Sequence, residues 1–303
     1  MSELPPALSR RAFISTAVAA GAALSLDAIG QTASAPRFRI AGFTKPFQSI
    51  GYEHTAEVVA EIGWSGIECP VRLKGQVEPE RVADELPKLH AALKSRGLDL
   101  DIVTTDIVGV STPFAEQVLR TAKQLGCSRY RLGFFRYKLD QPIAAQLANL
   151  KAGLRDLAAL NKELGMRGGI QNHSGATHLG CAVWDIHELV RDLDPTALGI
   201  CFDIGHGTLE GGTSWPIEAR LMEPFFAAVF VKDFLWQRGA KGFAPVWGPL
   251  GDGMVRREFF DWLKKSSFEG PISQHVEYIS GAGPEQIAIM KKDCATLKSW
   301  LGA

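Results

Sequence analysis

The stretch LGICFDIGH, residues 198–206, decides the fold. Its apolar first half is typical of a buried strand, and Asp203 follows where that strand ends. Three more stretches repeat the pattern: GGIQNH at 168–173, AVFVKD at 228–233 and PISQHVE at 271–277. Polar groups at the C-terminal ends of successive strands, in alternation with helices, are typical of the active-site face of a (β/α)8 barrel. The sequence therefore predicts an α/β protein with a TIM-barrel fold, and an enzyme.

Eight strand-like runs recur along the chain, with helical patterns between them. The strands are expected at 38–43, 66–68, 98–104, 130–135, 168–170, 198–202, 228–231 and 271–273. Helical spacing of apolar residues predicts helices at 55–62, 80–94, 112–126, 144–164, 184–193, 216–226, 257–265 and 284–301. An open doubly wound sheet would need a glycine-rich first turn, and FTKP at 43–46 is not one. We expect a single barrel domain over residues 36–303.

The first 35 residues have the features of a leader rather than of the barrel. Arg10 and Arg11 precede a mildly apolar run that is shorter than the roughly 20 residues of a membrane span. The run ends near ASA at 33–35, which fits a small-x-small processing site, although Pro36 leaves the cut position open. Residues 1–35 are predicted to be a twin-arginine signal peptide, and the mature protein to be exported, periplasmic and free of the membrane.

Composition excludes several function classes. The 33 basic and 33 acidic residues give no net charge, which argues against a nucleic-acid or anionic-membrane surface. The five cysteines are widely spaced without a CxxC pair, so neither a disulfide framework nor a zinc knuckle is indicated. The expected partner is a small molecule, and a homo-oligomer is left open.

Three motifs in fixed order resemble those of a known superfamily. They are Phe202-Asp203-x-x-His206, Val231-Lys232-Asp233 and the turn PLGDG at 249–253. From Phe38 to the C-terminus the chain resembles the xylose-isomerase-like TIM-barrel superfamily, which contains sugar and sugar-phosphate isomerases, epimerases and inosose-processing enzymes. The partner that this resemblance implies is a small-molecule carbohydrate.

The resemblance also implies one divalent cation (Mn, Mg, Co or Zn), held by a Glu, an Asp, a His and a Glu at the ends of strands five to eight. Here those places are taken by Gln171, Asp203, Phe230 and Glu277. Gln171, Asp203 and Glu277 are the candidate metal ligands of an incomplete set, and such a site binds a hard cation more weakly. His173 or His275 could replace the missing ligand, so the sequence leaves metal binding open.

The candidate catalytic residues are Glu277, Asp203, Lys232 and His206. Glu277 is the candidate base, and Asp203 a metal ligand or second acid/base. Lys232 alternates with Phe230, so its ammonium is expected to face the barrel centre, where it could stabilise an enediolate oxygen. The alternatives are a structural salt bridge of Lys232 with the two carboxylates, and a His206 that only bonds its glycine-flanked loop.

The candidate substrate-binding residues are Glu68, Arg131, His173, Trp236 and Trp247. Glu68 ends a strand and Arg131 lies within one, so both could bind hydroxyl groups; an inter-strand salt bridge is the alternative. His173 could equally be a packing histidine. Trp236 and Trp247 belong to an aromatic group that also contains Trp215, Phe234 and Phe243. Aromatic platforms suit the apolar faces of sugar rings, and a hydrophobic lid or a dimer contact is the alternative.

Together these residues predict a sugar isomerase or epimerase that removes a proton next to a carbonyl, forming an enediolate from a free sugar, keto-sugar or glycoside. A 3-keto-glycoside lyase or hydratase would use the same proton abstraction. The alternative from another class is a non-catalytic exported carbohydrate-binding protein, which the loss of two ligands favours. Apurinic endonuclease chemistry would need a histidine-rich multi-zinc site and a basic face, and the sequence has neither.

Overall fold

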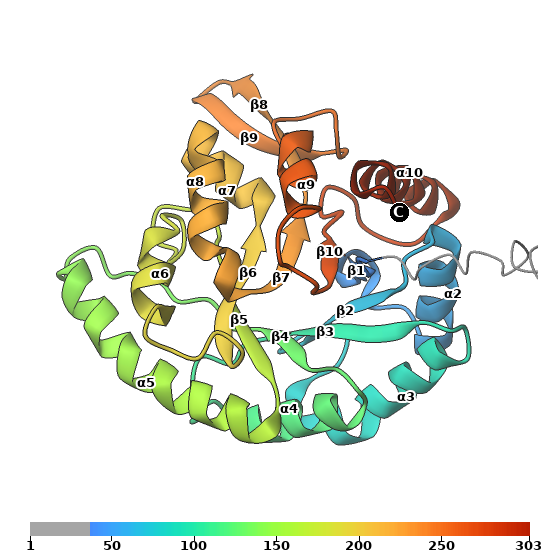
Figure 1. Cartoon of the computed structure of the whole chain (residues 1–303). Helices are drawn as coiled ribbons and strands as arrows, with labels where there is room; N and C mark the ends of the chain where they lie inside the picture. Colours follow the sequence, from blue (N-terminus) through green and yellow to red (C-terminus); the bar gives the residue numbers. More distant parts are fainter. Residues whose placement is uncertain (1–36) are drawn as a thin grey trace, which may run out of the picture. The chain divides into compact units, whose positions relative to one another are not determined.

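Eight parallel strands close into a barrel in the computed structural model of the chain, which describes residues 37–303 (Figure 1). Around the barrel their order is β1-β10-β7-β6-β5-β4-β3-β2. The strands are β1 (Ile40–Phe43), β2 (Gly66–Val71), β3 (Asp99–Thr105), β4 (Arg129–Arg131), β5 (Arg167–Gln171), β6 (Leu198–Asp203), β7 (Phe226–Val231) and β10 (Ile272–Gln274). The predicted TIM barrel and its eight strands are confirmed. The predicted signal peptide lies outside the described residues.

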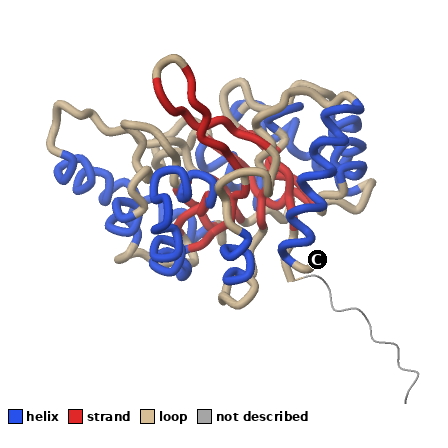
Figure 2. Tube along the Cα trace, turned by 90° about the horizontal axis from the view of Figure 1, so that it is seen from above, coloured by secondary structure: helices blue, strands red, loops and turns tan. Residues whose placement is uncertain are grey.

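Helices surround the barrel and alternate with its strands (Figures 1 and 2). They are α2 (Tyr52–Ile62), α3 (Val82–Lys94), α4 (Ala115–Gln124), α5 (Ile143–Leu164), α6 (Trp184–Val190), α7 (Ile204–Gly211), α8 (Trp215–Met222), α9 (Arg257–Leu263) and α10 (Pro284–Leu301). Four short 3-10 helices join them: η1 (Lys45–Phe47), η2 (Pro79–Arg81), η3 (Gly212–Ser214) and η4 (Glu223–Phe225). Within residues 37–303, no helix is long and apolar enough to span a bilayer.

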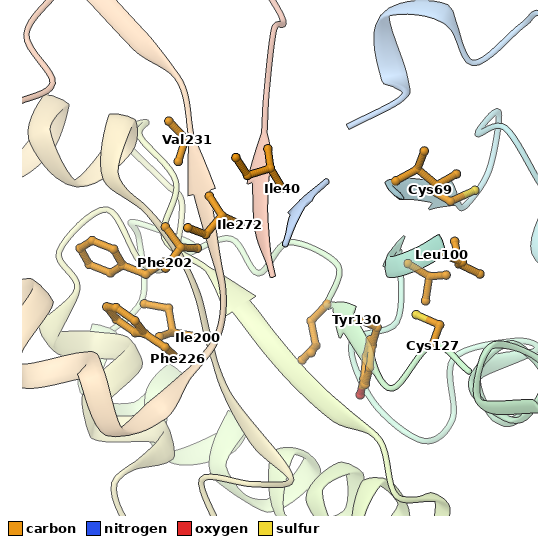
Figure 3. Packing of buried hydrophobic residues seen from close by; sticks show 14 of the residues in the cluster. Ile40, Cys69, Leu100, Cys127, Tyr130, Ile200, Phe202, Phe226, Val231 and Ile272 are labelled. Atoms are coloured by element: carbon orange, nitrogen blue, oxygen red, sulfur yellow. The ribbon is translucent and has the colours of Figure 1, made fainter. Parts of the chain in front are cut away.

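Apolar side chains fill both sides of the strands. Between barrel and helices, the Phe202 and Phe226 rings stack with centroids 5.0 Å apart (Figure 3). A separate buried cluster consists of Ile102, Cys201, Ala227, Ala228 and Phe230. Cys201 alternates with Phe202 and shares the facing of Asp203, so this cluster fills the barrel interior. The barrel is therefore a packed core, and its chemistry is confined to the end where the strands finish.

The segment after β6 is helical, whereas the sequence predicted a glycine-flanked loop around His206. Asp203 is the N-cap of α7, and its side chain accepts a hydrogen bond of 3.0 Å from the backbone N–H of His206. This cap satisfies an orphan donor of the first turn, which offsets the low helix propensity of the glycines. The loop prediction is wrong, and His206 is a buried residue in the first turn of α7.

A two-stranded hairpin follows β7, where the sequence predicted only an aromatic-rich loop. Strands β8 (Asp233–Gly239) and β9 (Gly242–Gly248) pair antiparallel, and they stand clear of the barrel (Figures 1 and 2). Residue pairing places Phe234 opposite Trp247, and Trp236 opposite Pro245. The base of the hairpin thus lies over the barrel end while its tip is exposed.

Asp233 fixes this hairpin to the turn that follows it. Its buried carboxylate accepts hydrogen bonds of 2.8–3.1 Å from the backbone N–H groups of Phe234, Gly251, Gly253 and Val255. A Cβ on Gly253 would lie only 2.3 Å from the Asp233 carboxylate, so the turn needs glycine there. The PLGDG turn is therefore built around one buried carboxylate.

Candidate active site

A small cavity of about 70 Å3 opens among the C-terminal ends of the barrel strands. Its walls come from the ends of β1, β2, β4, β5, β7 and β10 and from the loops that follow them. The lining residues are Phe43, Lys45, Arg72, Arg131, Phe134, Gln171, His173, Lys232, His275 and Glu277. Residues far apart in the sequence therefore meet at the end of the barrel where TIM-barrel enzymes carry their active sites.

Lys232 stands between the two predicted carboxylates. Its Nζ lies 3.3 Å from Oδ2 of Asp203 and 3.7 Å from Oε1 of Glu277, and it is 4.8 Å from the centroid of the Trp247 ring. Gln171 donates from Nε2 to the same Oδ2 of Asp203 over 2.8 Å. Gln171, Asp203 and Glu277 thus meet around the ammonium group of Lys232.

The electrostatics of these groups follow from that ammonium. Burial alone would raise the pKa of Asp203, but the charge of Lys232 lowers it to about 2. Burial likewise opposes ionisation of Glu277, yet Lys232, His275 and Lys45 hold its pKa well below the usual range. Lys45 contributes an ion pair of 2.8 Å to Oε2 of Glu277. Both carboxylates are therefore ionised at neutral pH.

Glu68 does not reach the cavity, which corrects its prediction as a hydroxyl-binding group. It is completely buried, accepts a hydrogen bond from Thr104, and lies 2.8 Å from Nε2 of His275. Burial lowers the pKa of His275, but Glu68 and Glu277 outweigh this and raise it. Glu68 therefore contacts His275, and Nδ1 of the same ring lies 3.4 Å from Oε1 of Glu277.

His206 is also withdrawn from the cavity. It is 2% exposed, its Nδ1 accepts a hydrogen bond of 3.2 Å from the backbone N–H of Ser174, and the ring packs against Trp247 with centroids 5.0 Å apart. Burial keeps its pKa well below the ordinary value, so the ring is neutral. His206 therefore does not line the cavity, because Trp247 and His173 cover it, and its catalytic role stays a prediction.

The remaining predicted substrate-binding residues divide into two groups. Arg131 and His173 line the cavity, and burial lowers the pKa of His173 to about 4. Trp247 lies beside the cavity against Lys232, whereas Trp236 is 46% exposed further out on the hairpin. Trp236 does not line the cavity.

The family is settled by a sequence match. The family described as xylose isomerase-like TIM barrel matches residues 56–300. The chain belongs to this family. No curated protein sequence matches the chain.

Solved structures of xylose isomerase-like barrels share the fold at low identity. A 3-keto-D-glucoside 4-epimerase from E. coli is 15% identical, with a TM-score of 0.66, over 86% of this chain and 99% of that one. A probable 3-DHS dehydratase from Bacillus anthracis is 16% identical, with a TM-score of 0.65, over 86% and 99% of the two chains. A xylose isomerase-like protein from Mycobacterium smegmatis, solved in complex with magnesium, is 14% identical, with a TM-score of 0.64, over 87% and 98%.

The donor set of this xylose isomerase-like barrel does not fit a divalent cation. Gln171 turns its amide nitrogen, not its oxygen, toward Asp203, and Phe230 brings an aromatic ring to within 4.5 Å of the His275 ring. The Lys232 ammonium stands between Asp203 and Glu277, where it would repel a metal ion. Residues 37–303 contain no group of three or more His, Cys, Asp or Glu side chains arranged to hold a metal.

Two cavity cations were missed in the sequence. Arg72 follows β2, which was predicted to end at Glu68 and in fact continues to Val71. Lys45 lies in the first 3-10 helix after β1. Both residues are polar side chains just beyond the end of a barrel strand. The same pattern identified Lys232, and it could have identified them as well.

Proposed function

We propose that this protein is a sugar isomerase or epimerase that removes a proton from a carbon next to a carbonyl and stabilises the enediolate with Lys232. The observation that carries the proposal is the buried Lys232 ammonium, held between Asp203 and Glu277 at a cavity on the catalytic end of the barrel. A fixed positive charge in a site of low dielectric stabilises a developing oxyanion strongly.

In this mechanism Glu277 is the base and is the carboxylate that lines the cavity. Its pKa is low while Lys232 points at it. When the ammonium donates instead to the forming enediolate oxygen, Glu277 loses that stabilisation and becomes more basic. Proton removal and enediolate stabilisation are thereby coupled through a single side chain.

Two neighbouring groups have supporting roles. Asp203 is fully buried and does not line the cavity, so we assign it the positioning of Lys232 rather than acid/base chemistry. His173 bonds the Ser174 carbonyl oxygen through Nδ1 over 2.9 Å, which leaves Nε2 as an acceptor. His173 is the second cavity group able to take up or return a proton, as an epimerisation or an elimination requires.

A lyase or hydratase acting on a 3-keto-glycoside is the second candidate. The observation that favours it is the aromatic hairpin, whose residues extend from Trp247 beside Lys232 to the exposed Trp236. Such a surface suits the second ring of a glycoside better than a single free sugar.

The deciding experiment measures hydrogen exchange from heavy water into a panel of keto-sugars, both neutral and acidic, and of 3-keto-glycosides. Wild-type protein should catalyse exchange, and Glu277→Gln should reduce the rate about a hundredfold or more, because an amide is not basic at neutral pH. Glu285→Gln, at an exposed position in the first turn of α10, is the matched control and should keep the wild-type rate.

Full activity in Glu277→Gln would remove this residue as the base. Absence of exchange by the wild type across the whole panel would favour the non-catalytic carbohydrate-binding protein instead.

A further inference from the structure

Arg131 is a buried cation without an anionic partner. It is 2% exposed, yet no ion pair among residues 37–303 includes it. Its side chain makes one long hydrogen bond, 3.5 Å from Nη1 to Oε1 of Gln171, and lies 4.4 Å from the centroid of the Phe134 ring. A guanidinium has five N–H donors, and burying it unpaired is costly. Arg131 lines the cavity, so its remaining N–H donors are available to a molecule bound there.

The nearby carboxylates are already engaged. Glu68 is held by His275 and Thr104, and Asp203 by Gln171 and Lys232. Glu277 is paired with Lys45. None of the three forms an ion pair with Arg131, although the Glu68 charge acts on it from a distance.

Arg72 adds a second guanidinium to the same cavity. It too is absent from the ion pairs of the described residues. Burial lowers the pKa of Arg131 to about 10; the charge of Glu68 opposes this lowering, and repulsion by Arg72 adds to it. Lys45, Arg72, Arg131 and Lys232 line the cavity against the single carboxylate of Glu277. A cavity with this imbalance attracts an anion.

We propose that Arg72 and Arg131 bind a carboxylate of the substrate, so that the substrate is a sugar acid (an aldonate, a uronate or a related keto acid) and not a neutral sugar. This inference rests on the proposed function, because it assumes that the sugar occupies this cavity. The planar fork of a guanidinium matches the two oxygens of a carboxylate. Neutralising that carboxylate also removes its repulsion of the negative charge that develops on the enediolate.

The test is equilibrium binding to the full chain by calorimetry. The probes are D-glucuronate, D-galacturonate and D-gluconate, with D-glucose and D-galactose as neutral counterparts and D-glucose 6-phosphate as the phosphate counterpart. At least one acid should bind about tenfold or more tightly than its neutral counterpart, and its affinity should fall as NaCl is added.

Two variants and one control locate the effect. Arg72→Ala should weaken binding of that acid about tenfold or more and leave neutral sugars unaffected. Arg131→Lys keeps the buried charge but loses the fork, and should also weaken the acid selectively. Arg136→Ala is the control, because Arg136 lines a neighbouring pocket and not this one, and it should bind like the wild type.

Equal affinity for acids and neutral sugars would overturn the proposal, as would binding of the phosphate ester alone, or an equal loss in Arg136→Ala and Arg72→Ala. Because binding requires no chemistry, the outcome is separate from that of the exchange experiment. Acid binding without hydrogen exchange would keep the carboxylate site and remove the isomerase. Exchange into neutral keto-sugars without a preference for acids would keep the isomerase and remove the carboxylate site.

Discussion

Lys232 is the residue on which the site depends. Its neighbour at the alternate position, Phe230, is buried in the barrel interior, so the β7 pleat directs Lys232 toward the same axis. There it pairs with Asp203 and Glu277, whose charges would otherwise repel each other in a buried place. The salt bridges of Lys232 with the two carboxylates, which the sequence analysis gave as a structural alternative, are present. In the proposed mechanism they also hold the ammonium in place for stabilising the enediolate.

Replacing Lys232 by methionine should lower the exchange rate about a hundred- to thousandfold, the range found when an oxyanion donor is removed. The same change leaves Asp203 as an unpaired buried carboxylate and should cost about 3–5 kcal/mol of unfolding free energy. The double variant Lys232→Met/Asp203→Asn removes that charge and should regain most of the stability without regaining activity. Recovery of activity in the double variant would show that the single variant had failed through misfolding alone.

Asp293 provides a prediction about pH. Burial raises its pKa to about 6, although the Tyr278 hydroxyl donates to Oδ2 over 2.8 Å. The ordinary value is about 3.9 in the unfolded chain, so between roughly pH 4 and pH 6 the folded state binds more protons, and stability falls as pH rises through this window.

Asp293→Asn should therefore match the wild type at pH 4 and exceed it by about 2–3 kcal/mol at pH 7.5, measured by urea unfolding at both pH values. The same difference at both pH values would contradict the assignment of the effect to ionisation of this group.

At the scale of elements, strands such as β6 and β7 were predictable because each is a short apolar run bounded by polar or glycine residues, and the regular alternation with helical patterns located the others, including β4 with its sequence RYR. Helix α7 was not, because its glycines predict a loop and the Asp203 cap outweighs them only once Asp203 is buried. The hairpin could have been found from the glycines at both ends of its turn, Gly239 and Gly242. The contacts of Arg131 with Gln171 and of Glu68 with His275 could not have been predicted, because they form only when strands far apart in the sequence close into the barrel.

The turn built on Asp233 is expected to depend on that carboxylate. Asp233→Ala would leave four backbone N–H groups without their acceptor and should cost about 3 kcal/mol or more of unfolding free energy, measured in urea. Asp252→Ala, at an exposed position of the same turn, should change stability by less than about 0.5 kcal/mol. Comparable losses in both variants would mean that the turn is sensitive to any change and not to the Asp233 hydrogen bonds.

At the scale of the whole molecule, we propose that the protein works outside the cytoplasm. This rests on Arg10 and Arg11, which lie outside the described residues. Changing both to lysine should retain the protein in the cytoplasm, because the twin-arginine pathway reads the arginine pair. Cell fractionation with a cytoplasmic marker enzyme as control measures this, and unchanged export would refute the leader assignment.

The ammonium between Asp203 and Glu277 is joined covalently to the chain. A bound metal ion has to be acquired from the surroundings, competes with other ions for its place and can be removed by a chelator. The charge of a lysine is encoded in the sequence and is in position as soon as the barrel closes. A site organised in this way has its positive charge in place at the end of folding. The presence of that charge does not vary with the metal content of the medium.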